Sequence, residues 1–164
     1  MSEGTEVKPF ACSDNDLNEF LCEEAANYTK ELLAVTYIFE NDIDTVVYFS
    51  LFNDSVNLKD KPSPDRNRVN RAIPNQKRIN SYPAVKVGRL AVSEKYERQG
   101  IGNQVLNFVK QMFTYNNKTG CRYITVDAYA AAIPFYVKNG FRFLTADDEG
   151  DDTRLMYFDL KKFI

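Results

Sequence analysis

The stretch that decides the fold is Glu97-Arg98-Gln99-Gly100-Ile101-Gly102. An apolar run from Val85 to Val92 precedes it, and an amphipathic run from Asn103 to Phe113 follows it. This order predicts a strand, a glycine loop and a helix. The start of a helix carries about half a positive charge and several unpaired N–H donors, and glycine lets a ligand approach the backbone closely. The segment therefore indicates a site for the phosphate or pyrophosphate of a cofactor.

Two common phosphate-binding motifs do not fit this segment. A dinucleotide-binding fold needs a third glycine and an acidic residue about 20 positions later. Gln104 and Val105 stand where that third glycine would fall. A P-loop needs Gly-Lys-Ser or Gly-Lys-Thr, whereas Asn103 follows Gly102. An ordinary strand-to-helix turn stays open as the structural interpretation of the glycine pair.

The composition limits the class of protein. The 164 residues suit one domain (1–164), and 44% hydrophobic with 13% aromatic residues supply a filled core. Cys12, Cys22 and Cys121 are odd in number and scattered, which favours a reduced, cytoplasmic setting over a disulfide framework. The polar segment Met1 to Lys8 is not a signal peptide. No apolar run approaches the ~20 residues that cross a bilayer, so we expect no membrane partner.

The chain contains no histidine. This excludes Ser-His-Asp and Cys-His nucleophilic sites and every histidine-ligated metal, and we expect no metal. The acidic run 147–152 lacks the oxygen spacing of a calcium-binding EF-hand loop and is interpreted as a hairpin loop. Any reaction that the protein catalyses has to use side chains other than histidine, backbone dipoles or water. This favours catalysis by positioning and electrostatics.

Periodicity predicts the other elements. Ser13 to Asp16 resembles a capping box ahead of a helix over about 14–30. Strands are expected at 34–40, 45–52, 83–92, 121–128, 141–144 and 155–160, with a turn at 41–44. Helices are expected at 101–115 and 130–139, the second ended by Gly140. Strands 83–92 and 121–128 should be parallel, because the helix between them makes a right-handed crossover.

Residues 57–82 are expected to form a basic, proline-interrupted insert. They hold seven cations against Asp60 and Asp65, in a chain whose formal net charge is −2. The insert is either a solvated loop or a patch for a polyanion such as RNA. Arg66, Arg68 and Arg71 are the candidate substrate-binding residues within it.

The order of these elements, with Ala132-Ile133-Pro134-Phe135-Tyr136 and Asn139-Gly140-Phe141 after the second strand, resembles the GNAT-type N-acetyltransferases. The resemblance is strong over residues 83–143 and looser before them. It implies an α/β fold with a mixed, mostly antiparallel central sheet flanked by helices. In that fold the parallel strands 83–92 and 121–128 splay apart.

The resemblance also implies acetyl transfer from acetyl-CoA to a primary amine. The pantetheine would insert between the splayed strands along Leu90, Ala91 and Val92, and the Val92 N–H would polarise the acetyl carbonyl. Tyr136 would be the general acid that protonates the CoA thiolate, although it could also be a core tyrosine. The backbone of the loop and first helical turn would bind the pyrophosphate, through Arg98, Gln99, Gly100, Ile101, Gly102 and Asn103.

Two positions depart from the family pattern. Glu97 stands where the family usually has Gln or Arg, so its side chain is not expected to contact a phosphate. Tyr129 stands where an Asn often contacts the cofactor, which puts that contact in question.

A narrower resemblance concerns the N-terminal half. Three stretches are similar to the GNAT toxins of bacterial toxin–antitoxin pairs. They are Phe10-Ala11-Cys12-Ser13 with residues 17–21 after it, residues 47–51, and residues 88–92. This implies aminoacyl-tRNA as acceptor and a small DNA-binding antitoxin as partner; a homodimer is a further expectation.

The amine chemistry agrees with this acceptor. An α-amine with a pKa of about 7.7–8 is partly neutral at pH 7, whereas a lysine amine at about 10.4 needs a dedicated base. Glu94 or Asp127 could still serve as that base. The alternatives are a small-molecule or protein amine as acceptor, and a non-catalytic CoA-binding module.

Overall fold

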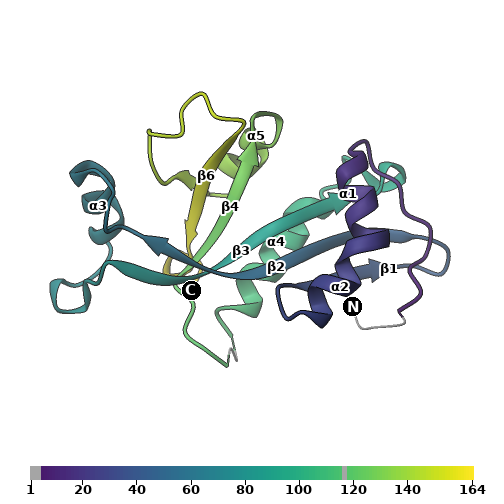
Figure 1. Ribbon diagram of the computed structural model, residues 1–164, viewed down its shortest axis with the longest axis horizontal. Helices are drawn as coiled ribbons and strands as arrows, with labels where there is room; N and C mark the ends of the chain where they lie inside the picture. The colour runs from purple at the N-terminus through teal and green to yellow at the C-terminus, as the bar shows by residue number, and fades with distance from the viewer. Residues whose placement is uncertain (1–4, 116–117) are drawn as a thin grey trace. The chain divides into compact units, whose positions relative to one another are not determined.

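The computed structural model describes residues 5–115 and 118–164. They form a six-stranded, mixed but mostly antiparallel sheet in the order β1-β2-β3-β4-β6-β5, with helices beside it and one parallel pair of strands (Figure 1). The chain divides into two compact units. The first unit is Met1–Asn53 with Lys86–Val109, and the second is Asp54–Val85 with Lys110–Ile164. The predicted fold class is confirmed, and the splay between 83–92 and 121–128 stays a prediction.

The elements follow the predicted order. They are α1 (Asn15–Glu19), the π-helical turn η1 (Phe20–Glu24), α2 (Ala25–Lys30), β1 (Val35–Glu40), β2 (Thr45–Asn57), α3 (Ser63–Asn70), η2 (Asn75–Lys77), β3 (Ser81–Val92), η3 (Glu94–Tyr96), α4 (Ile101–Met112), β4 (Tyr123–Tyr129), η4 (Ala130–Ala132), α5 (Ile133–Lys138), β5 (Arg142–Phe143), β6 (Thr153–Asp159) and η5 (Leu160–Lys162).

The structure corrects two local predictions. Strand β2 runs to Asn57 rather than residue 52, because its alternation of exposed and buried residues continues to the buried Val56. Residues 57–82 contain the helix α3, which the prolines do not prevent. Pro64 lies in the first turn of α3, where proline's missing N–H has no helical partner to lose.

The first unit is built on β1 and β2. These strands pair antiparallel from Val35↔Leu51 to Glu40↔Thr45, and α1 and α2 lie across them in Figure 1. The side chain of Asp14 accepts a hydrogen bond from the Asp16 N–H at the start of α1, so an N-cap lies within the segment Ser13 to Asp16. Between the two helices, the π-helical turn η1 buries Phe20 against the sheet.

The second unit is built on β4 and β6, which pair antiparallel from Tyr123↔Asp159 to Tyr129↔Thr153. Helix α5 ends at Gly140, whose φ of 86° few other residues adopt. The Phe141 N–H donates to the Tyr136 carbonyl at 3.0 Å and completes the predicted C-cap. In the part of the chain that the structure describes, no helix combines the length and apolar character needed to span a membrane.

Gly88, in the middle of β3, provides a test of packing in the first unit. A Cβ built there would lie 2.3 Å from Cε2 of Phe52. We expect Gly88→Ala to lower the free energy of unfolding by about 1–3 kcal/mol, because the aromatic ring or the strand must shift. Chemical denaturation measures this. The matched control is Gly120→Ala, where a Cβ meets open space, and it should change stability by less than about 0.5 kcal/mol. Equal effects of the two variants would contradict the packing argument.

Candidate active site

The glycine loop connects β3 to α4 within the first unit. After Val92 the chain makes the short turn η3, and residues 97–100 are exposed. Arg98 and Gly100 have φ values of 59° and 80°, so the backbone adopts the left-handed conformation at two positions before α4 begins at Ile101. Backbone of this kind can point successive N–H groups toward an anion, and the N-terminus of α4 adds its dipole. The predicted pyrophosphate-binding residues therefore lie on this loop and on the first turn of α4. Their contact with a cofactor stays a proposal.

A buried carboxylate ties this loop to the turn between β1 and β2. Asp44 is 5% exposed and accepts hydrogen bonds from Lys95 Nζ at 2.8 Å and from the Tyr96 hydroxyl at 3.0 Å. Asn41 donates to the same Tyr96 hydroxyl at 2.7 Å, and its side-chain oxygen accepts the Asp44 N–H at 2.8 Å. Lys95 and Tyr96 immediately precede the loop, so this network holds its first residues. Sequence reasoning did not single out Asp44.

The charge of Asp44 depends on these partners. The hydrogen bond from Lys95, and then that from Tyr96, hold the pKa of Asp44 below its ordinary value of 3.8 despite burial. Because the folded-state pKa is depressed, the network stabilises the fold above about pH 4 and is lost as the pH falls through the lower folded value.

Arg89 is a second residue that sequence reasoning missed. It lies on β3, and its guanidinium carbon is 5.0 Å from the centroid of the Phe20 ring. Its Nη1 donates to the Gly88 carbonyl at 2.9 Å, while its Nε is buried and has no hydrogen-bond partner among the described residues. The available signal was a single arginine within the apolar run that precedes the glycine loop.

Tyr136 lies on α5 in the second unit and is 7% exposed. Its ring makes edge-to-face contacts with Phe135 and Phe141, with centroid distances of 5.1 and 5.3 Å. Burial raises the pKa of Tyr136 to about 12, so the hydroxyl is a proton donor at neutral pH. The C-terminal end of α5 is held by Lys110, whose Nζ donates to the Asn139 carbonyl at 3.0 Å.

The three candidate arginines of the basic segment do not share one environment. All three are exposed, Arg66 and Arg68 on α3 and Arg71 at its C-cap. Arg68 also forms an ion pair with the buried Asp65 and donates to the Leu144 carbonyl at 2.7 Å. Arg68 therefore attaches α3 to the segment after β5, which is a structural role that its sequence position did not reveal.

The acidic run between β5 and β6 is a loop, as predicted. Asp148 accepts hydrogen bonds from Arg154 Nε and the Leu155 N–H, both at 2.7 Å. Across residues 5–115 and 118–164, no group of three or more Cys, Asp or Glu side chains is arranged to hold a metal ion.

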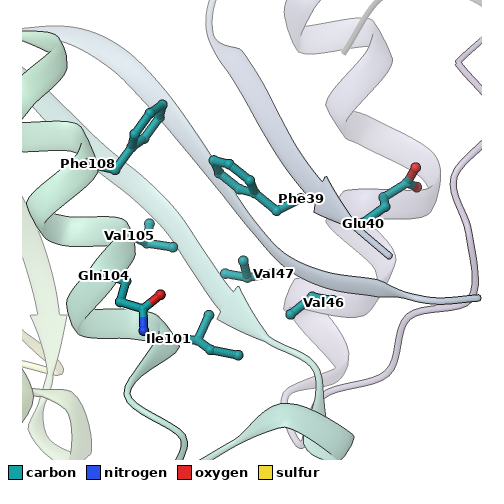
Figure 2. Close-up of a pocket in the computed structure, with 8 residues that line it drawn as sticks. All are labelled: Phe39, Glu40, Val46, Val47, Ile101, Gln104, Val105 and Phe108. Atoms are coloured by element: carbon teal, nitrogen blue, oxygen red, sulfur yellow. The ribbon is translucent and has the colours of Figure 1, made fainter. Parts of the chain in front are cut away.

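A pocket of about 370 Å³ opens beside the first turns of α4 in the first unit (Figure 2). Phe39 of β1 and Phe108 of α4 line one side of it and pack edge to face, with ring centroids 5.4 Å apart. Val47 of β2 and Ile101 also line it, and Glu40 is its charged residue. The sequence analysis did not predict this pocket, because its walls come from three separate elements.

The chain was compared with protein-family profiles, curated proteins and solved structures. The family profile of the acetyltransferase (GNAT) domain matches residues 73–162. One similar solved structure is a tyrosine-to-phenylalanine mutant of KacT, with a TM-score of 0.75 and 21% identity over 96% of this chain and 89% of that chain. Another is AtaT complexed with acetyl-methionyl-tRNAfMet, with a TM-score of 0.74 and 21% identity over 94% and 87%. A mutant AtaT toxin bound to the C-terminus of the antitoxin AtaR and acetyl-CoA has a TM-score of 0.74 and 19% identity over 99% and 91%. None of the curated proteins matches the chain.

The Asp44 network predicts how the glycine loop responds to mutation. Asp44→Asn removes the charge that orients Lys95 and leaves a weaker acceptor for Tyr96. We expect the KM for acetyl-CoA to rise about three- to tenfold with a smaller change in kcat, because the loop is less well ordered before binding. Asp42→Asn, in the exposed part of the same turn, is the matched control and should leave both constants unchanged. If Asp44→Asn leaves the KM for acetyl-CoA unchanged, the Asp44 network does not order the glycine loop for binding.

Proposed function

This chain belongs to the GNAT acetyltransferase family and is an acetyl-CoA-dependent N-acetyltransferase, and we propose that its acceptor is the α-amino group of an aminoacyl-tRNA. The observation that carries the acceptor is the basic segment 57–82, which presents the exposed arginines Arg66 and Arg71 in a chain of net charge −2. Such a cluster suits a phosphate backbone. AtaT, whose fold this chain shares, has been captured with acetyl-methionyl-tRNAfMet, which supports the same acceptor.

The proposed site assigns acetyl-CoA to the end of β3 and the loop that follows. The backbone of Leu90, Ala91 and Val92 pairs with the pantetheine, and the Val92 N–H polarises the thioester carbonyl. The N–H groups from Arg98 to Asn103 bind the pyrophosphate. No charged side chain is required for this part of the site, which is consistent with Glu97 replacing the usual Gln or Arg.

The transfer step needs one proton donor. The neutral amine attacks the thioester carbonyl, a C–N bond forms, and the C–S bond breaks. The proton of the attacking amine passes to water, and the Tyr136 hydroxyl protonates the departing thiolate. Burial raises the pKa of Tyr136 to about 12, so the hydroxyl keeps its proton at neutral pH until a stronger base such as a thiolate in a water-poor site accepts it.

The proposed acceptor also suggests a partner and a location. Acetylating aminoacyl-tRNA would block protein synthesis, so the cell needs an inhibitor of such an enzyme. We propose that this inhibitor is a small antitoxin protein, supported by the AtaT structure that contains the C-terminus of AtaR. A cytoplasmic location accompanies this proposal, because aminoacyl-tRNA is used there.

Tyr136→Phe tests the proton donor. The variant keeps the ring contacts with Phe135 and Phe141 but loses the hydroxyl. We expect turnover to fall by about 10²–10⁴ while the affinity for acetyl-CoA changes only a few-fold. Tyr115→Phe is the control, because Tyr115 is 60% exposed, and it should keep full turnover. Unchanged turnover in Tyr136→Phe would make Tyr136 a core residue only.

The pH profile gives the same test without a mutation. Because burial raises the pKa of Tyr136 to about 12, the donor stays protonated until the pH approaches that value. The wild-type kcat/KM should therefore rise through the acceptor pKa of about 8 and then stay level to about pH 10. A decline near pH 9 would mean that the proton donor has a pKa well below that of Tyr136, and it would contradict the assignment.

The arginines of the basic segment test the acceptor. We expect Arg66→Ala with Arg71→Ala to weaken tRNA binding and to flatten its log–log salt dependence by about 0.7–0.9 for each phosphate that the protein no longer neutralises. Acetyl-CoA binding should not change. Arg68→Ala is the matched control: it should lower the melting temperature, because Asp65 loses its partner, and alter the salt slope little. If the purified protein acetylates polyamines or peptides and ignores charged tRNA, the acceptor proposal is wrong and the family assignment stands.

A further inference from the structure

Arg89 is an arginine that the fold buries in part without providing an ionic partner. Its Nε has no hydrogen-bond partner among the described residues, and none of their carboxylates forms an ion pair with it. Its Nη1 donates to the carbonyl of its neighbour Gly88. A guanidinium stays charged at any physiological pH and carries five donors, so this arrangement leaves the charge without a counter-ion and most of the donors without a partner in the protein.

The surroundings of Arg89 orient its side chain. The guanidinium lies over the ring of Phe20, which is 1% exposed and belongs to the π-helical turn η1. Arg89 shares its face of β3 with Ala91, which packs in the cluster that contains Phe20 and Tyr48. Single π-helical turns occur often at functional sites, and here the turn supplies the surface that holds the guanidinium.

The position of Arg89 along β3 relates it to the proposed transfer site. Arg89 lies three residues before Val92, which corresponds to about 10 Å along a strand. In an aminoacyl-tRNA, the α-amine and the phosphate of the terminal nucleotide are joined by the ester and the ribose. The extended length of that connection is also on the order of 10 Å from standard bond lengths.

We propose that Arg89 binds the phosphodiester of the acceptor's terminal nucleotide while the α-amine reaches the acetyl group near Val92. The planar guanidinium fork matches two phosphate oxygens, and no carboxylate of the described residues compensates its charge. This inference rests on the proposed acceptor. It makes Arg89 a substrate-binding residue, separate from the cations of segment 57–82.

The experiment is steady-state acetylation of methionyl-tRNA by the full-length chain and its variants. For Arg89→Met we expect the KM for methionyl-tRNA to rise about tenfold or more, with kcat and the KM for acetyl-CoA within about threefold of wild type. The salt slope of tRNA binding should become less negative by about 0.7, the amount for one single-stranded phosphate. Arg89→Lys should recover part of the affinity as a point charge. Lys30→Met removes the same charge from the exposed end of α2 and should change none of these values.

Two outcomes would overturn the inference. One is an unchanged KM and salt slope in Arg89→Met. The other is a lowered melting temperature in both Arg89 variants without any change in KM, which would make the residue structural. If Arg89→Met does not fold, the KM and slope of Arg89→Lys decide the question.

Binding of the trinucleotide CCA, measured by calorimetry, separates this inference from the proposed function. CCA binding that is weakened in the Arg89 variants supports the phosphate contact even if wild type acetylates no aminoacyl-tRNA. Acetylation of methionyl-tRNA that does not depend on Arg89 overturns the contact and leaves the proposed function intact. CCA binding of equal strength in wild type and both variants also overturns it.

Discussion

The start of α4 imposes the constraint on which the site depends. A helix begins with up to four N–H groups that have no partner within the helix, and they can bind an anion only if the preceding chain leaves them accessible. Here the chain leaves β3 at Val92, turns through η3 and takes a left-handed conformation at Arg98 and Gly100 before α4 starts. The left-handed backbone at these two residues therefore shapes the proposed site. The proposed pyrophosphate contacts use backbone N–H groups and need no side chain from Glu97.

Electrostatics hold this loop from a distant part of the sequence. Asp44 belongs to the turn that joins β1 to β2, yet its carboxylate accepts from Lys95 and Tyr96. A buried carboxylate is costly unless it is paired, so the turn and the loop have to stay together. The hairpin thus holds the residues that lead into the glycine loop.

The arginine and lysine side chains of the chain have different roles, and the residue type alone does not show which role each has. Arg68 and Lys110 are used within the fold, one by Asp65 and the other by the C-terminal carbonyl of α5. Arg66 and Arg71 project into solvent, where a polyanion can reach them. Arg89 is intermediate, since it is packed against Phe20 but keeps an unused donor. Burial and partners, rather than charge alone, separate structural cations from those available to a substrate.

The sequence by itself determined the strand, glycine loop and helix, the helix that carries Tyr136, and its termination at Gly140. These features depend on local periodicity and on backbone conformations that few residues adopt, so neighbouring residues suffice to predict them. Only the tertiary structure decided that Arg68 bonds to Leu144, 76 residues away, and that Lys95 pairs with Asp44, 51 residues away. It also decided the position of Arg89 over Phe20 and the start of a helix at the prolines of 57–82. Such contacts join residues distant in the chain, and periodicity carries no information about which of them meet.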